Sequence, residues 1–465
     1  MSVAEATPDF EQGDRHDRAF LGHPKGLGYL GFTEGCERFS YYSMQTLLVL
    51  YMVNYLLVPG RMEKVVGLSW LQTHVYHGLT GQPLASAIFG TYTALVYFTP
   101  IFGGMLADGL LGRTRTLILG GVLMAIGHFL MAIESAFVFA LVALLLGVGA
   151  FKGNIATQVG DLYRANDLRR AMAFQIFYIF INVSVIVAPL ISGTLGQKVG
   201  WHYGFGCAGV VMVLGLIIYL SGRRWLPAEA PRARAEKAAT EDKMTRGDWT
   251  CVAYLIILIP VLAVAMLPNQ QIFNAYLVWG DQKFDLRLLN DTSSWLITVD
   301  AAVSFTMLVA VAAFWKWWGT RRREPDEITK MIIGSFFSIA GALCLFMAAL
   351  TAPPAGKISL FWPMGFELMN SIGFAHIMPV ALALFSKIAP RQITATVIGL
   401  YYLAFFGANA LVGWVGGLYS SLPTTTFWLI HAGSAAVGLF AFTLFKIAIR
   451  GRFDTGAKEQ VAALS

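Results

Sequence analysis

Residues 33–57 read TEGCERFSYYSMQTLLVLYMVNYLL, in which three ionisable side chains precede a long apolar run. Stretches of similar apolar character recur along the chain to about residue 449. A membrane-spanning helix needs roughly 20 mostly apolar residues. The sequence therefore predicts an all-α, multi-pass membrane protein, with Glu34, Glu37 and Arg38 inside its first span.

The overall composition agrees with this prediction. The 465 residues are 56% hydrophobic and only 13% charged, and the mean hydropathy of +0.61 lies far outside the range of soluble domains. Short charged or Gly/Pro-containing breaks separate twelve expected spans, which are 29–57, 84–109, 114–133, 135–160, 169–196, 201–222, 249–279, 291–318, 327–352, 357–388, 392–420 and 424–449.

One polar stretch, 223–248, divides these spans into six plus six. Duplicated halves are common in transporters. Most of the 34 Lys and Arg residues lie in the tails and loops expected on the same side of the membrane as the N-terminus. Because positive residues accumulate on the cytoplasmic side, both termini are predicted to be cytoplasmic. The expected parts are an N-terminal tail (1–28, without signal-peptide features), a six-helix bundle (29–222), a linker (223–248), a second six-helix bundle (249–449) and a C-terminal tail (450–465).

Several classes of function are excluded. The net charge of +7 arises from basic residues that set the topology and contact anionic lipid, so no nucleic-acid partner is expected. The four cysteines have no paired spacing, which argues against a disulfide framework or a metal site. No nucleophile with an adjacent base and no phosphate loop is found, so we expect neither an enzyme nor a cofactor.

Charged groups inside a span are costly unless they are paired or face water, so each is a candidate for function. On the first span, a spacing of three and four residues gathers polar side chains onto one face, which cannot face lipid. Two acids and one arginine leave one surplus negative charge, as a proton carrier requires. This face comprises Glu34, Glu37, Arg38, Tyr41, Tyr42 and Gln45.

Lys152 lies in the fourth span among three glycines, Gly147, Gly149 and Gly153, that allow close approach of a neighbouring helix. We expect it to meet the surplus carboxylate in a pair that protonation breaks, with a static structural ion pair as the alternative. On the fifth span Tyr178 and Asn182 share a stripe, where they either bind a solute or join helices by hydrogen bonds.

The sequence resembles a known family over most of both halves. The stretches that carry the resemblance are HPKGLGYLGFTEGCERFSYYSM, YTALVYFTPIFGGMLADGLLGR, GAFKGNI, FYIFIN and SKIAPRQITATVIGLYYLAFFGANALVG. They are similar to the proton-dependent oligopeptide transporters, a branch of the major facilitator superfamily. The resemblance implies that superfamily's fold, with 12 transmembrane helices in two six-helix bundles.

The most specific of these signals is the family's ExxER motif, here Glu34, Glu37 and Arg38, followed by Tyr42. By resemblance Lys152 is coupled to that motif, and Tyr97, Tyr178 and Asn182 belong to the substrate site. The turn after the second span resembles the superfamily's gate-bracing loop, through Gly104, Asp108, Gly112, Arg113 and Arg115; the alternative is that this turn only marks the membrane border.

Several expected binding positions differ from the family pattern. Gln45 stands where an arginine is usual, and its expected glutamate partner is replaced by Gln270 or Gln271. Phe374 occupies the position of the glutamate that holds the peptide amine, whereas Asp300 stands near an expected asparagine. We hypothesise that Asp300 takes over the amine; alternatively it pairs with a protein cation or stays protonated. Glu367 and His376 are weaker candidates.

These observations predict a monomeric inner-membrane symporter that imports di- and tripeptides with protons by alternating access. The altered tenth span leaves open another small amphoteric or anionic solute as the substrate. A non-transporting membrane sensor or a passive pore is less well supported.

Overall fold

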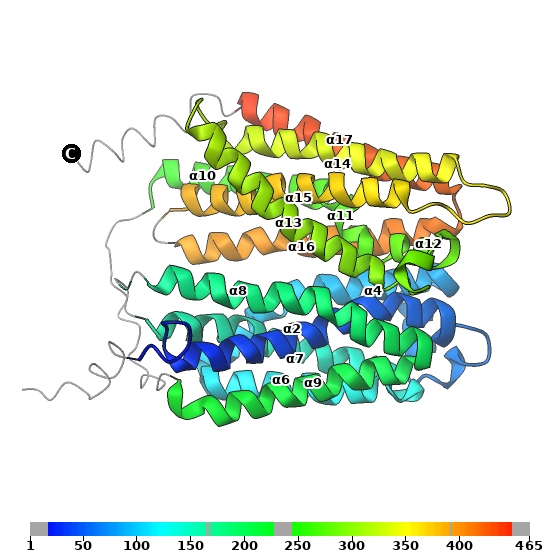
Figure 1. Cartoon of the computed structure of the whole chain (residues 1–465), viewed down its shortest axis with the longest axis horizontal. Coiled ribbons are helices and arrows are strands. Elements are labelled where there is room, and N and C mark those ends of the chain that lie inside the picture. Colours follow the sequence, from blue (N-terminus) through cyan, green and yellow to red (C-terminus); the bar gives the residue numbers. More distant parts are fainter. Residues whose placement is uncertain (1–16, 164–166, 168, 227–243, 391–392, 449–465) are drawn as a thin grey trace, which may run out of the picture. The chain divides into compact units, whose positions relative to one another are not determined.

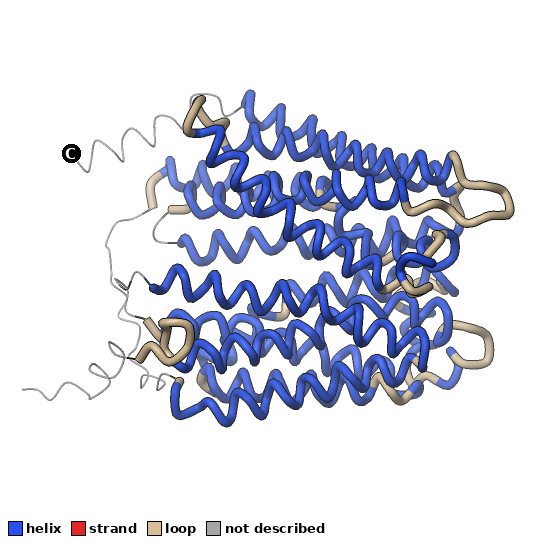
Figure 2. Tube along the Cα trace, in the orientation of Figure 1, coloured by secondary structure: helices blue, strands red, loops and turns tan. Residues whose placement is uncertain are grey.

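The computed structural model describes residues 17–163, 167, 169–226, 244–390 and 393–448, and these residues are helical apart from their connecting loops, with no strand among them (Figure 2). Much of the predicted tails and linker, 1–16, 227–243 and 449–465, lies outside the described residues. The expected all-α class is confirmed. The main helices are α2 (Lys25–Tyr51), α4 (Gly81–Phe98), α5 (Pro100–Leu106), α6 (Arg113–Leu130), α7 (Phe137–Asp161), α8 (Arg169–Ala188), α9 (Trp201–Gly222), α10 (Arg246–Ala265), α11 (Leu267–Gln270), α12 (Ala275–Lys283), α13 (Trp295–Gly319), α14 (Glu327–Leu350), α15 (Phe361–Ile388), α16 (Thr394–Gly417) and α17 (Thr424–Ala448).

Within the described residues, ten helical segments are long and apolar enough to cross a membrane. The expected spans 29–57 and 114–133 are helical as α2 and α6 but are not among those ten. In α2 the central Glu34, Glu37 and Arg38 interrupt the apolar run. The chain is therefore a multi-span membrane protein, and the twelve-span topology stays a prediction.

The helices are apolar on more than one face, unlike the surface helices of soluble proteins. On α9, Met212 is fully buried, whereas Val210 and Ile217 are 62% and 57% exposed. Exposed apolar side chains of this kind occur on most of the long helices. Such surfaces suit contact with lipid and would be unfavourable in water.

The chain divides into two compact units, residues 1–78 with 95–238 and residues 79–94 with 239–465. In the first unit α2 packs against α8 and α9, and α6 packs against α7 and α9 (Figure 1). In the second unit α14 packs against α15 and α17, and α13 packs against α15. Most of α4 groups with the second unit, whereas its C-terminal end groups with the first.

A hydrogen-bond network explains why this part of α4 belongs to the second unit. Gln82 Nε2 donates to Ser86 Oγ at 2.7 Å and to the Gly416 carbonyl at 2.9 Å. Ser86 Oγ donates in turn to Asn274 Oδ1 at 2.8 Å. These polar groups are mostly buried, so each needs a hydrogen-bond partner. The hydrogen bonds that they form hold α4 against α16 and the start of α12.

One expected span is interrupted in the structure. The span 249–279 consists of three separate helices, α10, α11 and α12, and Asn274, which precedes α12, has non-helical backbone angles (φ −121°, ψ −108°). Pro268 lies at the start of α11, where its missing N–H is tolerated. In the expected span 84–109, Thr99 lies between α4 and α5 with helical backbone angles, and residues 81–111 remain one apolar segment long enough to cross a membrane.

Close helix packing in the first unit depends on glycine. A Cβ at Gly103 of α5 would lie 2.0 Å from the carbonyl oxygen of Gly149 on α7, and a Cβ at Gly149 would lie 2.7 Å from Thr99 Cβ. Both contacts would be severe clashes. Small residues therefore let α7 approach the junction of α4 and α5.

Replacing Gly103 with alanine is expected to destabilise the protein by about 1–3 kcal/mol, because the added methyl group would force the two helix backbones apart. The neighbouring Gly104 is the matched control, since a Cβ there meets nothing within 4 Å. Thermal unfolding of the two variants in detergent measures the difference. Equal melting temperatures would contradict the packing argument.

Candidate functional site

Two buried acids and one base form a cluster on α2. Glu34, Glu37 and Arg38 are 4%, 0% and 5% exposed. Arg38 Nε lies 3.1 Å from Glu34 Oε1, and it also pairs with Glu37. Arg38 Nη2 donates to Glu37 Oε1 at 2.9 Å. One guanidinium therefore serves two carboxyl groups, which leaves one negative charge in excess when both are ionised.

The rest of the polar face of α2 continues this cluster. Arg38 lies over the Tyr41 ring, 5.3 Å from its centroid, and the Tyr41 and Tyr42 rings meet edge to face with centroids 5.1 Å apart. Gln45 is buried, and Tyr42 is partly exposed. As the periodicity predicts for a face that cannot meet lipid, most of these side chains are buried.

Lys152 reaches the same region from α7. Its Nζ lies 4.7 Å from the centroid of the Tyr97 ring, near the end of α4, and it is within range for electrostatic interaction with Glu34 and Glu37. Within the described part of the chain, no ion pair joins Lys152 to either glutamate in this structure. The close approach of Gly149 to Thr99, one turn away, places Lys152 beside Tyr97.

The predicted residues on α8 lie on an exposed face. Tyr178 is 60% exposed, and Asn182 Nδ2 donates to the Tyr178 carbonyl at 2.8 Å. The opposite side of α8 packs against α2, where Ser184 Oγ donates to the Gly35 carbonyl at 2.8 Å. The amide of Asn182 is thus engaged locally, whereas the Tyr178 side chain is accessible.

In the second unit, the predicted residues lie on three helices. Gln270 ends α11, and its Oε1 accepts from Asn409 Nδ2 at 3.4 Å. The adjacent Gln271 is fully buried. Phe374 on α15 packs against the apolar core of this unit. Asp300 on α13 is partly exposed, but its Oδ1 is buried without a hydrogen-bond partner among the described residues.

The structure adds one residue, Tyr276, to those that the sequence singled out for the site, and it places Glu367, a weaker candidate from the sequence, beside it. Glu367 of α15 and Tyr276 of α12 are both fully buried. The Glu367 carboxyl lies beside both the Asp300 carboxyl and the Tyr276 hydroxyl. The sequence signal was available, because an intramembrane acid occurs on each of two spans, but only their packing shows that the acids meet.

The predicted gate-bracing loop forms a separate surface site. Gly104 lies on α5 and Asp108 on the π-helical turn η3 (Ala107–Leu111). Gly112 adopts φ 79° between this turn and α6, a backbone conformation that favours glycine. Arg113 Nη1 lies 2.8 Å from Asp161 Oδ2 at the end of α7. The ion pair therefore joins the start of α6 to the end of α7.

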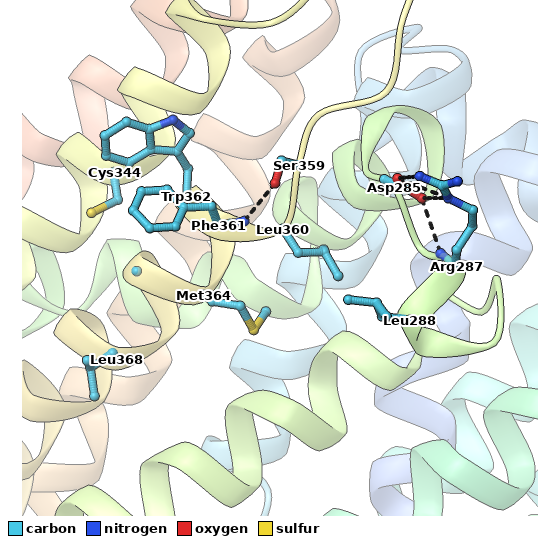
Figure 3. Close-up of a pocket in the computed structure, with 11 residues that line it drawn as sticks. Asp285, Arg287, Leu288, Cys344, Ser359, Leu360, Phe361, Trp362, Met364 and Leu368 are labelled. Carbon is cyan, nitrogen blue, oxygen red and sulfur yellow. Dashed lines mark hydrogen bonds and ion pairs between the residues drawn. The ribbon is translucent and has the colours of Figure 1, made fainter.

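Figure 3 shows a pocket of about 930 Å³ in the second unit. It is bordered by the loop with Asp285 and Arg287 and by the start of α15. Its lining is mostly apolar, and Leu288 and Phe361 are 86% and 72% exposed. None of the predicted site residues lines it, so we do not assign it to the substrate.

Comparisons with known proteins agree with the sequence resemblance. The family model PTR2, described as the POT family, matches residues 114–241. An uncharacterized transporter of Bacillus subtilis, YclF, is 29% identical over 92% of this chain and 93% of its own length. A di-/tripeptide transporter of Lactococcus lactis subsp. cremoris is 27% identical over 90% of this chain and 94% of its own length.

A solved structure gives the same result at the level of the fold. The crystal structure of a mutant peptide transporter POT in complex with alafosfalin has a TM-score of 0.78 and is 26% identical. The match covers 96% of this chain and 99% of that chain. Together, the family model, the relatives and this structure show that the chain is similar to transporters of the POT family over most of its length.

Proposed function

We propose that the protein is a proton-coupled symporter of the inner membrane, which imports di- and tripeptides as a monomer by alternating access. The observation that carries this proposal is the buried cluster on α2, in which Arg38 serves both Glu34 and Glu37. The named peptide transporters among its relatives support the substrate class. Proton symport is typical of the family.

Within the cluster, Glu34 is the better candidate for the proton carrier. Arg38 approaches Glu37 with two nitrogens but Glu34 with one. Glu34 Oε2 and Glu37 Oε2 are both buried without a hydrogen-bond partner in the described part of the chain, but Glu37 Oε2 forms an ion pair with Arg38 Nε. Protonating a carboxylate weakens its attraction to the arginine. This loss is smaller for Glu34, because it makes fewer contacts with Arg38.

Protonation at this position would change how strongly Lys152 is held. With both acids ionised, the excess negative charge attracts Lys152 towards α2; with Glu34 neutral, the charges of Glu37 and Arg38 balance and the attraction falls. Lys152 is then free to remain at the Tyr97 ring, as in this structure. A proton, like any ligand, shifts a conformational equilibrium only if it binds one conformation more strongly than the other.

We assign substrate contacts to side chains of both units. Tyr42, Gln45, Tyr97, Tyr178 and Asn182 are the candidates in the first unit. In the second unit we propose Gln270, Phe374 and Asp300, with Asp300 holding the peptide amine. Gly104, Asp108, Gly112 and Arg113 would brace the helix ends that move during gating.

Uptake by proteoliposomes tests the proposed function. Purified protein in vesicles with an inward proton gradient should accumulate radiolabelled dialanine, and collapsing the gradient with a protonophore should abolish accumulation. Uptake that persists unchanged after collapse would exclude proton coupling. Absence of uptake with dialanine, together with gradient-driven uptake of other solutes, would exclude peptides.

Replacing Asp300 with asparagine is expected to weaken the binding of free dipeptides. A hydrogen bond to a charged group contributes about 1.5–3 kcal/mol, so affinity should fall roughly 10- to 100-fold. Competition assays would compare dialanine with N-acetyl-dialanine, which lacks the amine charge. The substitution should affect only the first ligand, and unchanged dialanine affinity would contradict the assignment.

A second candidate function is proton-coupled uptake of another small amphoteric or anionic solute. Phe374 favours it, because an apolar ring on α15 cannot hold an amine as the expected glutamate would. Competition separates the two functions. Dialanine should block uptake if peptides are the substrates and should leave it unchanged if they are not.

A further inference from the structure

A second group of intramembrane acids lies in the second unit, where α13 packs against α15. Glu367 is fully buried, and its carboxyl lies beside that of Asp300 and the Tyr276 hydroxyl. Even so, neither Glu367 oxygen has a partner in hydrogen-bond geometry among the described residues. A fully buried carboxyl group in this position needs either a proton or a cation to compensate it.

The polar groups nearest to the pair are neutral. Tyr276 comes from α12, and Asn370 lies one turn after Glu367 with both amide atoms buried and unpartnered within the described chain. Ser304 of α13 and Ser371 of α15 share a hydrogen bond of 2.9 Å beside the pair. These groups supply dipoles but no positive charge.

The titratable groups on the surrounding helices are engaged elsewhere. Lys330 of α14 pairs with Glu324. His376, further along α15, accepts from Trp315 Nε1 at 3.1 Å. His431 of α17 is bonded to the Phe427 carbonyl at 2.8 Å. No described lysine, arginine or histidine therefore forms an ion pair with Asp300 or Glu367.

Two ionised carboxylates could not both persist here. At a separation of about 4 Å and an effective dielectric constant of about 20, two like charges repel by about 4 kcal/mol. Burial adds the loss of hydration for each charge. Carboxyl pairs in such surroundings titrate as a unit, and the first proton is shared between them.

We propose that Asp300 and Glu367 bind one proton between them and form a second proton site, separate from the cluster on α2. Asp300 is partly exposed, although its Oδ1 is buried, whereas Glu367 is fully buried. The proton leaves one negative charge on the pair. The site does not depend on peptides being the substrate, although the remaining charge would suit a cationic group of a solute at Asp300.

Infrared spectroscopy of purified, substrate-free protein tests this site. At neutral pH, the wild-type protein should show carboxylic-acid C=O absorption that is lost in the Asp300→Asn, Glu367→Gln double variant. Glu367→Gln alone should also lose it, because the remaining acid is partly exposed and ionises. Asp300→Asn alone should keep it at a shifted frequency, because Glu367 stays buried. Glu63→Gln, at an exposed position in the short 3₁₀ helix Met62–Lys64, is the matched control and should leave the spectrum unchanged.

Two results would overturn the proposal. One is a double-variant spectrum that matches the wild type in the acid region, which would place both carboxyls in the ionised form. The other is loss of the absorption on adding sodium ions, which would make the pair a metal-cation site. Size-exclusion chromatography of each variant checks folding. If the double variant does not fold, the spectrum of the single Glu367→Gln variant, whose side chain is nearly isosteric with the wild type, tests the proposal.

Because no substrate is present, failure of the infrared test leaves the proposed transport function unaffected. Conversely, if dialanine is not transported but the absorption behaves as expected, the proton site stands while the peptide assignment falls. The two ideas therefore have distinguishable outcomes.

Discussion

Replacing Lys152 with alanine is expected to reduce the accumulation of dialanine in proteoliposomes to the level outside. One proton that moves down a membrane potential of about 100 mV supplies about 2.3 kcal/mol, enough for roughly a 40-fold gradient of a co-transported neutral solute. In the proposed mechanism, the charge state of Glu34 would no longer bias the two conformations without the lysine, and this energy would not be transferred to the peptide.

The reason lies in the position of Lys152 between two partners. Its Nζ lies 4.7 Å from the centroid of the Tyr97 ring and interacts electrostatically with Glu34 and Glu37. Alanine removes both interactions but keeps the helical backbone of α7. The measurement is the ratio of internal to external dialanine at steady state under an imposed proton gradient.

A lysine outside the helices gives the matched control. Lys64 lies exposed in a short 3₁₀ helix (Met62–Lys64), and Lys64→Ala should accumulate dialanine as the wild type does. Exchange of internal for external dialanine without a gradient tests whether the Lys152 variant still binds and moves peptide. Undiminished gradient-driven accumulation by Lys152→Ala would refute the coupling mechanism.

The second large effect is expected for Arg38. Changing Arg38 to methionine leaves Glu34 and Glu37 buried without their cation. Removing one partner of a buried ion pair typically costs about 3–5 kcal/mol, against a total stability of about 5–15 kcal/mol. We expect a large loss of monodisperse protein and a lower melting temperature in detergent.

A triple variant separates stability from function. Glu34→Gln, Glu37→Gln and Arg38→Met together remove the uncompensated charges, so the fold should recover most of the lost stability. Proton-driven accumulation should remain absent, because no titratable acid is left on α2. A single Arg38→Met variant as stable as the wild type would show that the guanidinium does not compensate the two acids.

The sequence alone predicted the local features of this molecule well. Hydrophobic runs locate the helices because a helix in lipid must satisfy its own backbone and present apolar side chains outward. The buried cluster on α2 was also predictable, since Glu34, Glu37 and Arg38 lie within one helical turn and share a face whatever packs against it.

The interruption of the span after the linker was not predicted. Composition shows only that residues 249–279 are apolar, whereas the break at Asn274 follows from its hydrogen bonds with Ser86 and the Val412 carbonyl. These partners lie 188 and 138 residues away in the chain. Hydropathy averages over a window and carries no information about such distant partners.

The sequence by itself therefore determined a helical membrane protein with a charged cluster on its first expected span and a lysine on its fourth. Only the tertiary structure decided that the Lys152 ammonium group lies over the Tyr97 ring and that the Asp300 carboxyl lies beside that of Glu367. The physical reason is that helical periodicity fixes which side chains of one helix share a face. Which helix covers that face depends on interhelical packing, here on close contacts such as that between Gly103 and Gly149.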